Sequence, residues 1–486
     1  MEKNQEKVVK APKKGIRLWV FIVSIIATII VSVGLTMGII WTQLPKLISN
    51  QTQAHAFSKQ ELFQIEKVFY YLKQNYLDKN ITNEQLIQGA LKGMAESVGD
   101  PYTTYLVNDE TAQLDETVNG AFGGIGAELK SDQSRVVIST TMEGSPSQQV
   151  GLQSDDVITK VDGEDMTGKT ISEVVKKVRG EVGTDVVLTI ERAGTSLEVK
   201  LTRASIAINT VKAELDKEDA TIGHVRITSF AKNTAQELEK AVKDLTDKGA
   251  KAFVFDVRYN PGGLLDQAYK VANMFLKDGE PIVQVEDRFG EKKIYKASSD
   301  IGKFKITQPY VLLVNEGSAS ASKILAAAVK EGAGAQIVGT KTYGKGTVQS
   351  VIDISDNSEL KYTNAKWLTP KGNWIHKEGV TPTKEVTLPD YAFLKIIDAR
   401  ETLKVGSVSQ NVLSVETILK GLGYSVTADG YFDEATKNAV KSYQQKEGLT
   451  VSGEVDEETA QTLMNSVRQL IQQNDTQYQA AKELLK

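Results

Sequence analysis

Three short segments of the sequence carry residue types that could support acyl-transfer chemistry. The first is NEGSASASKILAAA, residues 315–328, in which Ser318, Ser320 and Ser322 occupy alternate positions. A serine hydroxyl becomes an effective nucleophile when a base removes its proton. Serine is also a preferred N-cap residue, so these side chains could instead cap a helix. This segment alone leaves both interpretations open.

The second segment, GTKTYGKGTVQ, could supply the base. Lys345 stands between Gly344 and Gly346, and we interpret the glycines as residues that allow unusual backbone dihedral angles and aim the amine inward. A lysine can act as a general base when burial lowers its pKa from about 10.4 toward about 7 to 8. Histidine, the usual base, is scarce. His224 begins a predicted strand and His376 lies in a polar turn, so we expect both to be structural.

The same segment matches GxxxxGK, part of the phosphate-binding loop signature, from Gly339 to Lys345. That signature requires serine or threonine directly after the lysine, and this chain has Gly346 there. The residues that follow are β-branched and predict a strand, whereas phosphate binding of this kind uses a helix N-terminus. We therefore do not expect nucleotide hydrolysis.

The third segment is DVRYNPGGLLDQA, residues 256–268. Asn260, Pro261, Gly262 and Gly263 would leave backbone amides free at the start of a helix. Such amides can stabilise the oxyanion of a tetrahedral intermediate. An ordinary strand-to-helix turn is the alternative for this segment.

Strands and helices alternate around these segments. The stretches HVRITSF, AFVFDVRY, PYVLLVNE and AQIVGT are rich in β-branched residues, and the stretches between them have helical periodicity. This alternation predicts a layered α/β domain with a largely parallel sheet. Because each segment follows a strand, crossover connections would bring all three to the carboxyl edge of one sheet, where active groups collect.

The N-terminal region predicts a membrane anchor. The apolar run from Leu18 to Trp41 contains no charged residue and is long enough to span a bilayer core of about 30 Å. Six basic residues precede it against two acidic ones, which predicts a cytoplasmic N-terminus with the rest of the chain outside. A cleaved signal peptide is the alternative, although the run is longer than usual and no small-x-small cleavage site follows it.

Composition excludes several other functions. The 486 residues carry a net charge of -4, so no basic surplus points to nucleic acid as a general partner. The absence of cysteine excludes disulfides, thiolate zinc sites and a cysteine nucleophile. The chemistry expected of the three segments requires no metal and no other cofactor.

Together the three segments resemble the carboxy-terminal processing peptidases, a family of serine proteases with a Ser-Lys catalytic pair. The resemblance extends over about residues 57–390 and includes VGDPYTTYL, GGIGAEL and HVRITSF. It implies an endopeptidase for protein or peptide substrates, with Ser320 as nucleophile, Lys345 as general base and Gln349 as the residue that orients the lysine. A non-catalytic scaffold with a vestigial peptidase core is the alternative, and the presence of all three residues weighs against it.

The resemblance also assigns roles to the neighbours of the nucleophile. The backbone amides of Ala321 and of Gly262 or Gly263 would form the oxyanion hole. Ser318 and Ser322 would then be capping or packing residues. These assignments would give each of the three alternating serines a different role.

Lys323 departs from the pattern of the family. The family often carries an acidic residue at this position, directly after the alternating serines. We expect the Lys323 side chain to face solvent on the new helix and to tune activity without abolishing it.

Residues 110–200 resemble the PDZ domain that these peptidases carry. The motif GGIG precedes a strand, so its amides could hold a terminal carboxylate while the strand edge pairs with an extended peptide. The residues of this predicted carboxylate loop are Gly124, Ile125 and Gly126. Asp155 replaces a common glycine, which leaves the tightness of that turn open. Arg179 either bridges to the protease or covers a helix.

Residues 405–468 resemble the peptidoglycan-binding domain of type one, a small module of three helices, so peptidoglycan is an expected partner. Tyr431, Phe432 and Tyr443 could stack on sugars or could form the core of this module. The family usually has glycine at the position of Asp433.

The sequence therefore predicts a multidomain α/β protein on the outer side of a cell membrane. A homodimer is expected from the resemblance and from the apolar helices predicted over residues 57–98. The predicted parts are a cytoplasmic tail (1–17), a transmembrane anchor (18–41), a helical N-terminal part of the peptidase (42–109), a β-sandwich-like PDZ domain (110–200), a Ser-Lys peptidase core (201–395), a peptidoglycan-binding-like module (405–468) and a helical tail (469–486).

Overall fold

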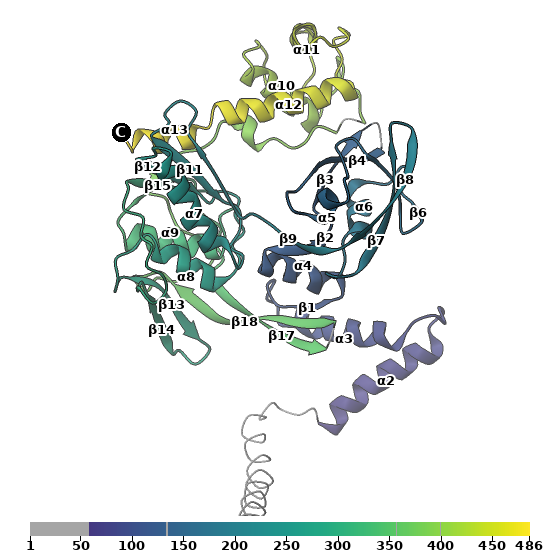
Figure 1. Ribbon diagram of the computed structural model, residues 1–486, viewed down its shortest axis with the longest axis vertical. Helices are drawn as coiled ribbons and strands as arrows, with labels where there is room; N and C mark the ends of the chain where they lie inside the picture. The colour runs from purple at the N-terminus through teal and green to yellow at the C-terminus, as the bar shows by residue number, and fades with distance from the viewer. Residues whose placement is uncertain (1–57, 133–134, 356, 399) are drawn as a thin grey trace, which may run out of the picture. The chain divides into compact units, whose positions relative to one another are not determined.

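The computed structural model describes most of the chain after the N-terminal region (Figure 1). The described residues are 58–132, 135–355, 357–398 and 400–486. The predicted anchor at 18–41 and the tail before it lie outside them. Within the described ranges, no helix combines the length and the apolar character that a bilayer crossing requires. The chain divides into two units, residues 1–90 and 91–486.

The first unit is helical where it is described. Its helix α2 (Lys59–Asn75) begins at Ser58, whose hydroxyl accepts a hydrogen bond from the Glu61 N–H, and the Glu61 carboxylate accepts one from the Ser58 N–H at 2.7 Å. None of the residues of α2 is buried. The next helix, α3 (Asn83–Ser97), runs from this unit into the second.

The region predicted to be a PDZ domain is an antiparallel β domain in the second unit. Its main sheet has the strand order β3-β4-β5-β7-β8, and β2 pairs with β9. Val186, Leu188 and Ile190 alternate along β7 and are fully buried, as expected for a strand with one face in the core. The elements are β2 (Ala121–Gly124), β3 (Ala127–Asp132), β4 (Arg135–Thr141), α5 (Pro146–Gln149), β5 (Val157–Val161), β6 (Glu164–Asp165), α6 (Ile171–Val178), β7 (Asp185–Arg192), β8 (Thr195–Thr202) and β9 (Ala204–Ala207).

Two residues that the sequence left open have clear roles in this region. Asp155 adopts a left-handed backbone conformation with φ of 69°, and its carboxylate pairs with Lys130 Nζ at 2.8 Å, so the turn forms without glycine. The Arg179 guanidinium lies 3.9 Å from the centre of the Phe122 ring and 2.7 Å from the Glu116 carboxylate, on α4 (Asp109–Asn119). Arg179 thus links the PDZ domain to the helix that precedes it.

The predicted peptidase core is built on a six-stranded sheet with the order β10-β11-β12-β15-β16-β19. Only the pair β10 and β11 is antiparallel; every other neighbouring pair is parallel. This arrangement confirms the predicted, largely parallel sheet. The strands are β10 (Val211–Leu215), β11 (Ile222–Ile227), β12 (Ala252–Asp256), β15 (Tyr310–Val314), β16 (Gln336–Gly339) and β19 (Lys384–Glu385).

Helices cover both faces of this central sheet. The helices of the first face are α7 (Thr234–Asp247), α8 (Leu265–Asn273) and α9 (Ala321–Glu331). Phe253 and Phe255 of β12 pack in the core on that side. Val254, between them, points to the opposite face and packs with Ala480 of α13 (Thr476–Glu483). Figure 1 shows α13 beside β12 and β15, so the last helix of the segment predicted as a helical tail at 469–486 packs on the central sheet.

A second, antiparallel sheet carries the residues that follow Lys345. Its order is β1-β18-β13-β14, and β17 pairs with β18. Because β1 pairs with β18, the residues just before β1 lie beside this hairpin, and Thr363 Oγ1 donates to Asp100 Oδ2 at 2.6 Å. The strands are β1 (Thr104–Val107), β13 (Pro281–Asp287), β14 (Lys292–Lys296), β17 (Thr347–Ser355) and β18 (Ser358–Leu368).

The C-terminal module stands in the chain between β19 and α13, two elements of the peptidase core. Phe432 and Tyr443 are buried in the module, whereas Tyr431 is exposed, so of the three aromatic residues Tyr431 alone is accessible for stacking on sugar. Asp433 caps α11, because its Oδ1 accepts a hydrogen bond from the Thr436 N–H at 2.7 Å. The module contains η1 (Asp390–Phe393), α10 (Gln410–Gly421), α11 (Glu434–Glu447) and α12 (Glu457–Gln473).

Candidate active site

The three alternating serines have different environments. Ser318 and Ser322 are buried, and their hydroxyls donate to the backbone carbonyls of Val257 at 2.7 Å and Asn260 at 2.9 Å. Ser320 is half-buried, and its side chain makes no capping hydrogen bond to the helix that it precedes. Its φ of 49° and ψ of -115° are unusual for a residue with a side chain, and such strain is concentrated at functional sites. The middle serine is therefore the one whose hydroxyl is not used for packing.

The Asn-Pro-Gly-Gly loop lies directly against Ser320. Asn260 is fully buried, its Nδ2 donates to the Ile227 carbonyl at 2.8 Å, and its Oδ1 accepts from the Gly262 N–H at 2.8 Å. A Cβ added to Gly262 would lie 2.6 Å from the Ser320 Cβ. Gly262 is required both for this close approach and for its φ of 103°. The loop and the serine turn thus pack as one rigid unit.

The predicted oxyanion donors differ in availability. The Gly262 N–H is already bonded to Asn260, so it is not free to donate in this geometry. The N–H groups of Gly263 and Ala321 have no acceptor among the described residues. Ala321 is also the first residue of α9, where the helix dipole favours negative charge. Gly263 and Ala321 therefore remain as the candidate pair of donors.

Arg258 fixes the end of the strand that leads into this loop, a role that no sequence pattern indicated. Its Nη2 lies 2.8 Å from Asp256 Oδ2 and 2.7 Å from Asp475 Oδ2, and its Nη1 donates to Gln477 Oε1 at 3.0 Å. Burial alone would raise the pKa of Asp256, but the bond from His224 and the charge of Arg258 hold that pKa well below its usual range. His224 therefore takes a structural position, as expected.

The turn that carries Lys345 is held by the backbone of a later segment. The Lys377 N–H donates to the Gly344 carbonyl at 2.6 Å, and the Gly346 N–H donates to His376 Nδ1 at 3.2 Å. A Cβ on Gly344 or Gly346 would lie 2.6 Å or 2.8 Å from that backbone. Neither glycine has a left-handed φ, so the expected reason for them was wrong: they permit close packing, not unusual dihedral angles.

The amine of Lys345 is partly withdrawn from water. Its Nζ lies 4.4 Å from the centre of the Tyr102 ring. Burial and the charge of Lys361 lower the pKa of Lys345, against an opposing effect of the Asp100 carboxylate. A lowered pKa increases the share of the neutral amine, which is the form that can accept a proton.

No hydrogen bond joins Lys345 Nζ to Ser320 or Gln349 in the part of the chain that the structure describes. The Gln349 amide donates instead to two threonine hydroxyls, at 3.0 Å and 3.2 Å. The two turns are nevertheless adjacent, because the Tyr343 N–H donates to the Ser318 carbonyl at 3.1 Å. The site is thus assembled at the level of the backbone, while the lysine side chain points to Tyr102.

Lys323 does not face solvent as expected. It is fully buried, because α9 is enclosed by α8, β13 and β16. Its Nζ donates to the backbone carbonyl of Lys345 and lies 5.4 Å from the centre of the Trp367 ring. The uninterrupted apolar run ILAAAV after Lys323 was the sequence signal for a helix without a polar face.

The predicted carboxylate loop of the PDZ domain presents free amides. The Ile125 carbonyl accepts from the Ser147 N–H at 2.8 Å, and the Gly126 carbonyl accepts from the Ser145 and Ser147 hydroxyls at 3.2 Å and 2.8 Å. The N–H groups of Ile125 and Gly126 have no acceptor among the described residues. Gly124 ends β2 directly before them. Carbonyls turned inward and amides left free are what capture of a terminal carboxylate requires.

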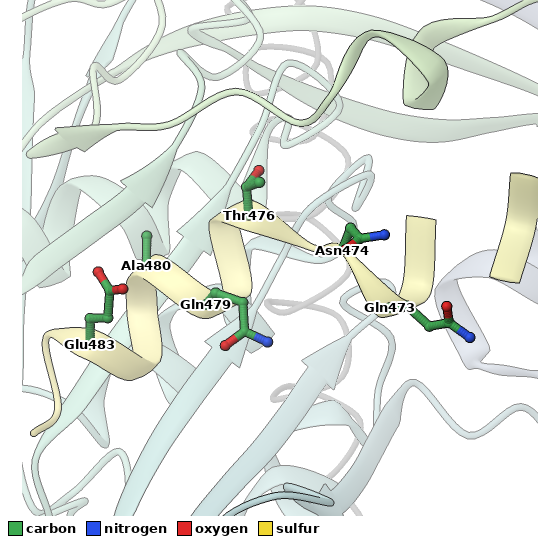
Figure 2. A pocket seen from close by; sticks show the side chains of 6 residues that line it. All are labelled: Gln473, Asn474, Thr476, Gln479, Ala480 and Glu483. Carbon is green, nitrogen blue, oxygen red and sulfur yellow. The ribbon is translucent and has the colours of Figure 1, made fainter. Parts of the chain in front are cut away.

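A surface concavity of about 440 Å³ lies where α12 ends and α13 begins (Figure 2). Its lining is mostly amide and aliphatic. The lining residues are Gln473, Asn474, Thr476, Gln479, Ala480 and Glu483. The hydroxyl of Thr476 in this lining donates to the Thr387 carbonyl at 2.7 Å, so it is engaged in a structural hydrogen bond.

Comparison with known proteins agrees with this geometry. Residues 221–386 match the model of peptidase family S41, and the carboxy-terminal processing protease CtpA of Bacillus subtilis (strain 168) is 38% identical over 475 residues, 98% of this chain and 99% of that protein. The chain belongs to peptidase family S41. It is a serine-type peptidase, which confirms the predicted resemblance and does not favour a non-catalytic scaffold.

Other matches cover the remaining parts of this peptidase. Residues 137–192 match a PDZ domain, 408–463 a putative peptidoglycan binding domain and 32–111 the activating protease CtpB N-terminal domain. A probable CtpA-like serine protease of Staphylococcus aureus (strain MRSA252) is 36% identical over 460 residues, 94% of this chain and 90% of that protein. The solved structure of the photosystem II D1 C-terminal processing protease has 31% identity and a TM-score of 0.39, over 67% of this chain and 86% of that chain.

Proposed function

We propose that this protein is a membrane-anchored, extracytoplasmic C-terminal processing endopeptidase that cleaves protein substrates with Ser320 as nucleophile and Lys345 as general base. The conformation of Ser320 is the observation that supports this proposal most strongly. Its strained backbone places a hydroxyl that is not needed for packing at the start of α9, against a glycine loop and beside unpaired amides. The turn of Lys345, whose pKa is lowered by burial, adjoins it.

Acylation begins when the Lys345 side chain turns from Tyr102 toward Ser320, with the Gln349 amide holding the amine. Ser320 Oγ attacks the scissile carbonyl carbon, and its proton passes to the neutral Nζ of Lys345. The amides of Gly263 and Ala321 bind the oxyanion of the tetrahedral intermediate. Lys345 then gives the proton to the leaving amine as the C–N bond breaks, and an acyl ester on Ser320 remains.

Deacylation uses the same groups in the same order. A water molecule gives a proton to Lys345 and attacks the ester carbonyl, and the amides again hold the oxyanion. When the C–O bond breaks, Lys345 returns the proton to Ser320 Oγ. Both half-reactions therefore require a neutral amine at their start, which is why burial of Lys345 matters.

The other domains would select and localise the substrate. The free amides of Ile125 and Gly126 suit the terminal carboxylate of a protein, as expected for a processing enzyme that recognises C-termini. The apolar run at 18–41 would anchor the chain with its N-terminus in the cytoplasm, and the C-terminal module would hold the enzyme near peptidoglycan. The exposed apolar residues of α2 fit a homodimer contact.

The test of this function compares the full-length protein in detergent with Ser320→Ala and Lys345→Met. Each is incubated with an unfolded protein that ends in a free carboxylate, and with the same protein carrying a C-terminal amide. We expect cleavage by the wild type alone, faster for the free carboxylate. Equal products from the wild type and Ser320→Ala would refute the assignment of the nucleophile.

The proposed location is tested on intact cells from which the wall has been removed. External protease should degrade an epitope placed at residue 486 and spare one placed at residue 1. Protection of the C-terminal epitope would contradict the proposed orientation. A membrane-free form of the protein that carries the C-terminal epitope and lacks the N-terminal one would instead indicate that the apolar run is cleaved off.

A further inference from the structure

The strongest feature that the proposed mechanism does not use is the buried amine of Lys323. Lys323 follows Ser320 by three residues, in the first turn of α9, and its side chain is fully buried. Its Nζ donates to the backbone carbonyl of Lys345 and lies 5.4 Å from the centre of the Trp367 ring. Among the described residues, no carboxylate forms an ion pair with this amine. Burial of an unpaired lysine is costly and requires an explanation.

The turn Gly344–Gly346, here called the GKG turn, is held by several hydrogen bonds, and the Lys323 amine makes one of a different kind. The Trp374 Nε1–H donates to the Gly346 carbonyl at 2.9 Å, and His376 and Lys377 bond the same turn. Those three residues belong to one later segment. On the serine side, the Tyr343 N–H donates to the Ser318 carbonyl at 3.1 Å, two residues before Lys345. Lys323 adds a bond to the carbonyl of Lys345 itself, from the helix that begins at Ser320.

We propose that Lys323 is a positioning residue that ties the base-bearing turn to the nucleophile-bearing helix and thereby fixes the distance between Lys345 and Ser320. This role rests on the proposed Ser-Lys mechanism. The bond from Lys323 holds the Lys345 carbonyl at the start of α9, so only the side chain of Lys345 remains free to move. To reach Ser320, the Lys345 amine then needs only rotation about its side-chain bonds.

The protonation of Lys323 fits this role. Burial first, and then the charge of Lys345, lower the pKa of Lys323 to about 7. The amine is therefore about half neutral near pH 7, and its N–H groups can donate to the carbonyl in either protonation state. A neutral Lys323 does not repel the positive charge that Lys345 acquires from Ser320. The other ionisable groups around this pair include Tyr102, His376, Lys377, Lys361 and Asp100.

The experiment separates the hydrogen bond from the bulk of the side chain. Lys323→Met keeps the length and removes the donor, whereas Lys323→Gln keeps a neutral donor. Lys330→Met is the matched control, because Lys330 lies on the same helix and donates to the Thr381 carbonyl at 2.8 Å, away from the GKG turn. Steady-state cleavage of one peptide, thermal unfolding and the rate of labelling of Ser320 by a fluorophosphonate are measured for each full-length protein.

We expect Lys323→Met to lower kcat and the labelling rate by about 10 to 100-fold with KM changed less than about 2-fold. Lys323→Gln should recover most of that loss, and Lys330→Met should match the wild type. Wild-type kcat in folded Lys323→Met, or equal losses in the Met and Gln variants, would overturn the positioning role. Should Lys323→Met fail to fold, Lys323→Leu removes the donor on a shorter side chain, and wild-type kcat in that variant would overturn the positioning role equally.

These outcomes are distinct from failure of the proposed function. If Ser320→Ala cleaves as well as the wild type, the Ser-Lys mechanism itself is wrong. If cleavage depends on Ser320 but not on the donor at Lys323, the mechanism stands and only the positioning role falls.

Discussion

The two sides of the candidate active site are organised differently. On the oxyanion side, Asn260 bonds its own loop and a neighbouring strand, and Gly262 packs on Ser320 with no room for a Cβ. On the base side, the backbone of the GKG turn is equally fixed, but the Lys345 amine lies over the Tyr102 ring without a bond to Ser320 among the described residues.

This difference shows which part of catalysis the fold can prepare in advance. Backbone amides cannot turn away once their loop is packed, so a loop such as Asn-Pro-Gly-Gly keeps its donors in place in the resting enzyme. A long side chain has several rotamers, and Lys345 can leave the nucleophile without any change in the backbone. Movement of one side chain would therefore be sufficient to complete or to dismantle the dyad.

The largest expected effect comes from removal of the base. Lys345→Met should lower kcat by about 10² to 10⁴-fold, because the proton of Ser320 then has no acceptor in reach. Lys341→Met, an exposed lysine of the same segment, is the control and should be fully active. Steady-state cleavage of a peptide checks both. Activity of Lys345→Met within a few-fold of the wild type would show that another group is the base.

The next largest effect is expected on stability, from replacement of the buried Arg258 that holds the strand end before the proposed oxyanion loop. Arg258→Met leaves the Asp256 carboxylate buried without its main partner, which should lower the free energy of unfolding by about 3 to 5 kcal/mol. Arg400→Met is the control, because the Arg400 side chain is 90% exposed and its pair with Asp398 should add nothing measurable. Urea unfolding at neutral pH measures both variants, and equal midpoints would contradict the difference.

The same pair predicts a dependence on pH. Because the folded-state pKa of Asp256 is depressed, its pairing stabilises the protein at pH values above the usual carboxyl pKa of about 4. That contribution is lost as the pH falls below this value toward the folded-state pKa. The gap in stability between the wild type and Arg258→Met should therefore narrow in acid, and a gap that widens would refute this account.

Space beside the nucleophile provides the next test. Gly262→Ala places a methyl group 2.6 Å from the Ser320 Cβ and should lower kcat by about 10²-fold by displacing the oxyanion donors. Gly334→Ala is the matched control, because Gly334 also has a left-handed φ, of 65°, but has nothing within 4 Å of an added Cβ. Both variants carry backbone strain, and only the first should lose activity when assayed as folded protein. Equal activities would indicate that the loop can shift freely.

The smallest expected effects are shifts of the pH dependence of kcat/KM, in opposite directions for two variants near Lys345. The active form of Lys345 is neutral, so kcat/KM rises as the pH passes its pKa. Asp100→Asn removes a charge that raises this pKa and should move the acidic limb to lower pH, whereas Lys361→Gln removes a charge that lowers it and should move the limb to higher pH. Each shift should be less than about one pH unit, because solvent screens these charges. Shifts in the same direction would argue against Lys345 as the titrating group.

Much of the fold could be predicted from the sequence, because the strands of the central sheet are continuous β-branched runs separated by amphipathic helices. Contacts between segments that are far apart in the sequence could not be predicted in this way. The helix α13 has an ordinary amphipathic sequence, and nothing in it indicates that Ala480 packs on Val254 and that Asp475 pairs with Arg258. Such contacts depend on the return of the chain after a whole module, which local patterns do not encode.

The site was predictable to a similar degree. Motif spacing indicated the turns of Ser320 and Lys345, since each follows a strand of the sheet, and the structure brings those turns together. The position of Lys323 was predicted wrongly, because a charged residue is usually exposed and only its apolar neighbours indicated otherwise. The direction of the Lys345 side chain could not be predicted at all, because rotamers depend on tertiary neighbours such as Tyr102.

The place of α13 in the chain has a consequence for biogenesis. During synthesis the central sheet is complete once β19 has emerged, but one of its faces stays uncovered until the entire C-terminal module and then residues 476–483 have followed. The carboxylate of Asp475, which steadies the strand end before the oxyanion loop, arrives equally late. A nascent protease of this design therefore acquires its finished catalytic layer only after residues 390–483 have followed the sheet, which limits the time in which a working enzyme could cut an unfolded copy of itself.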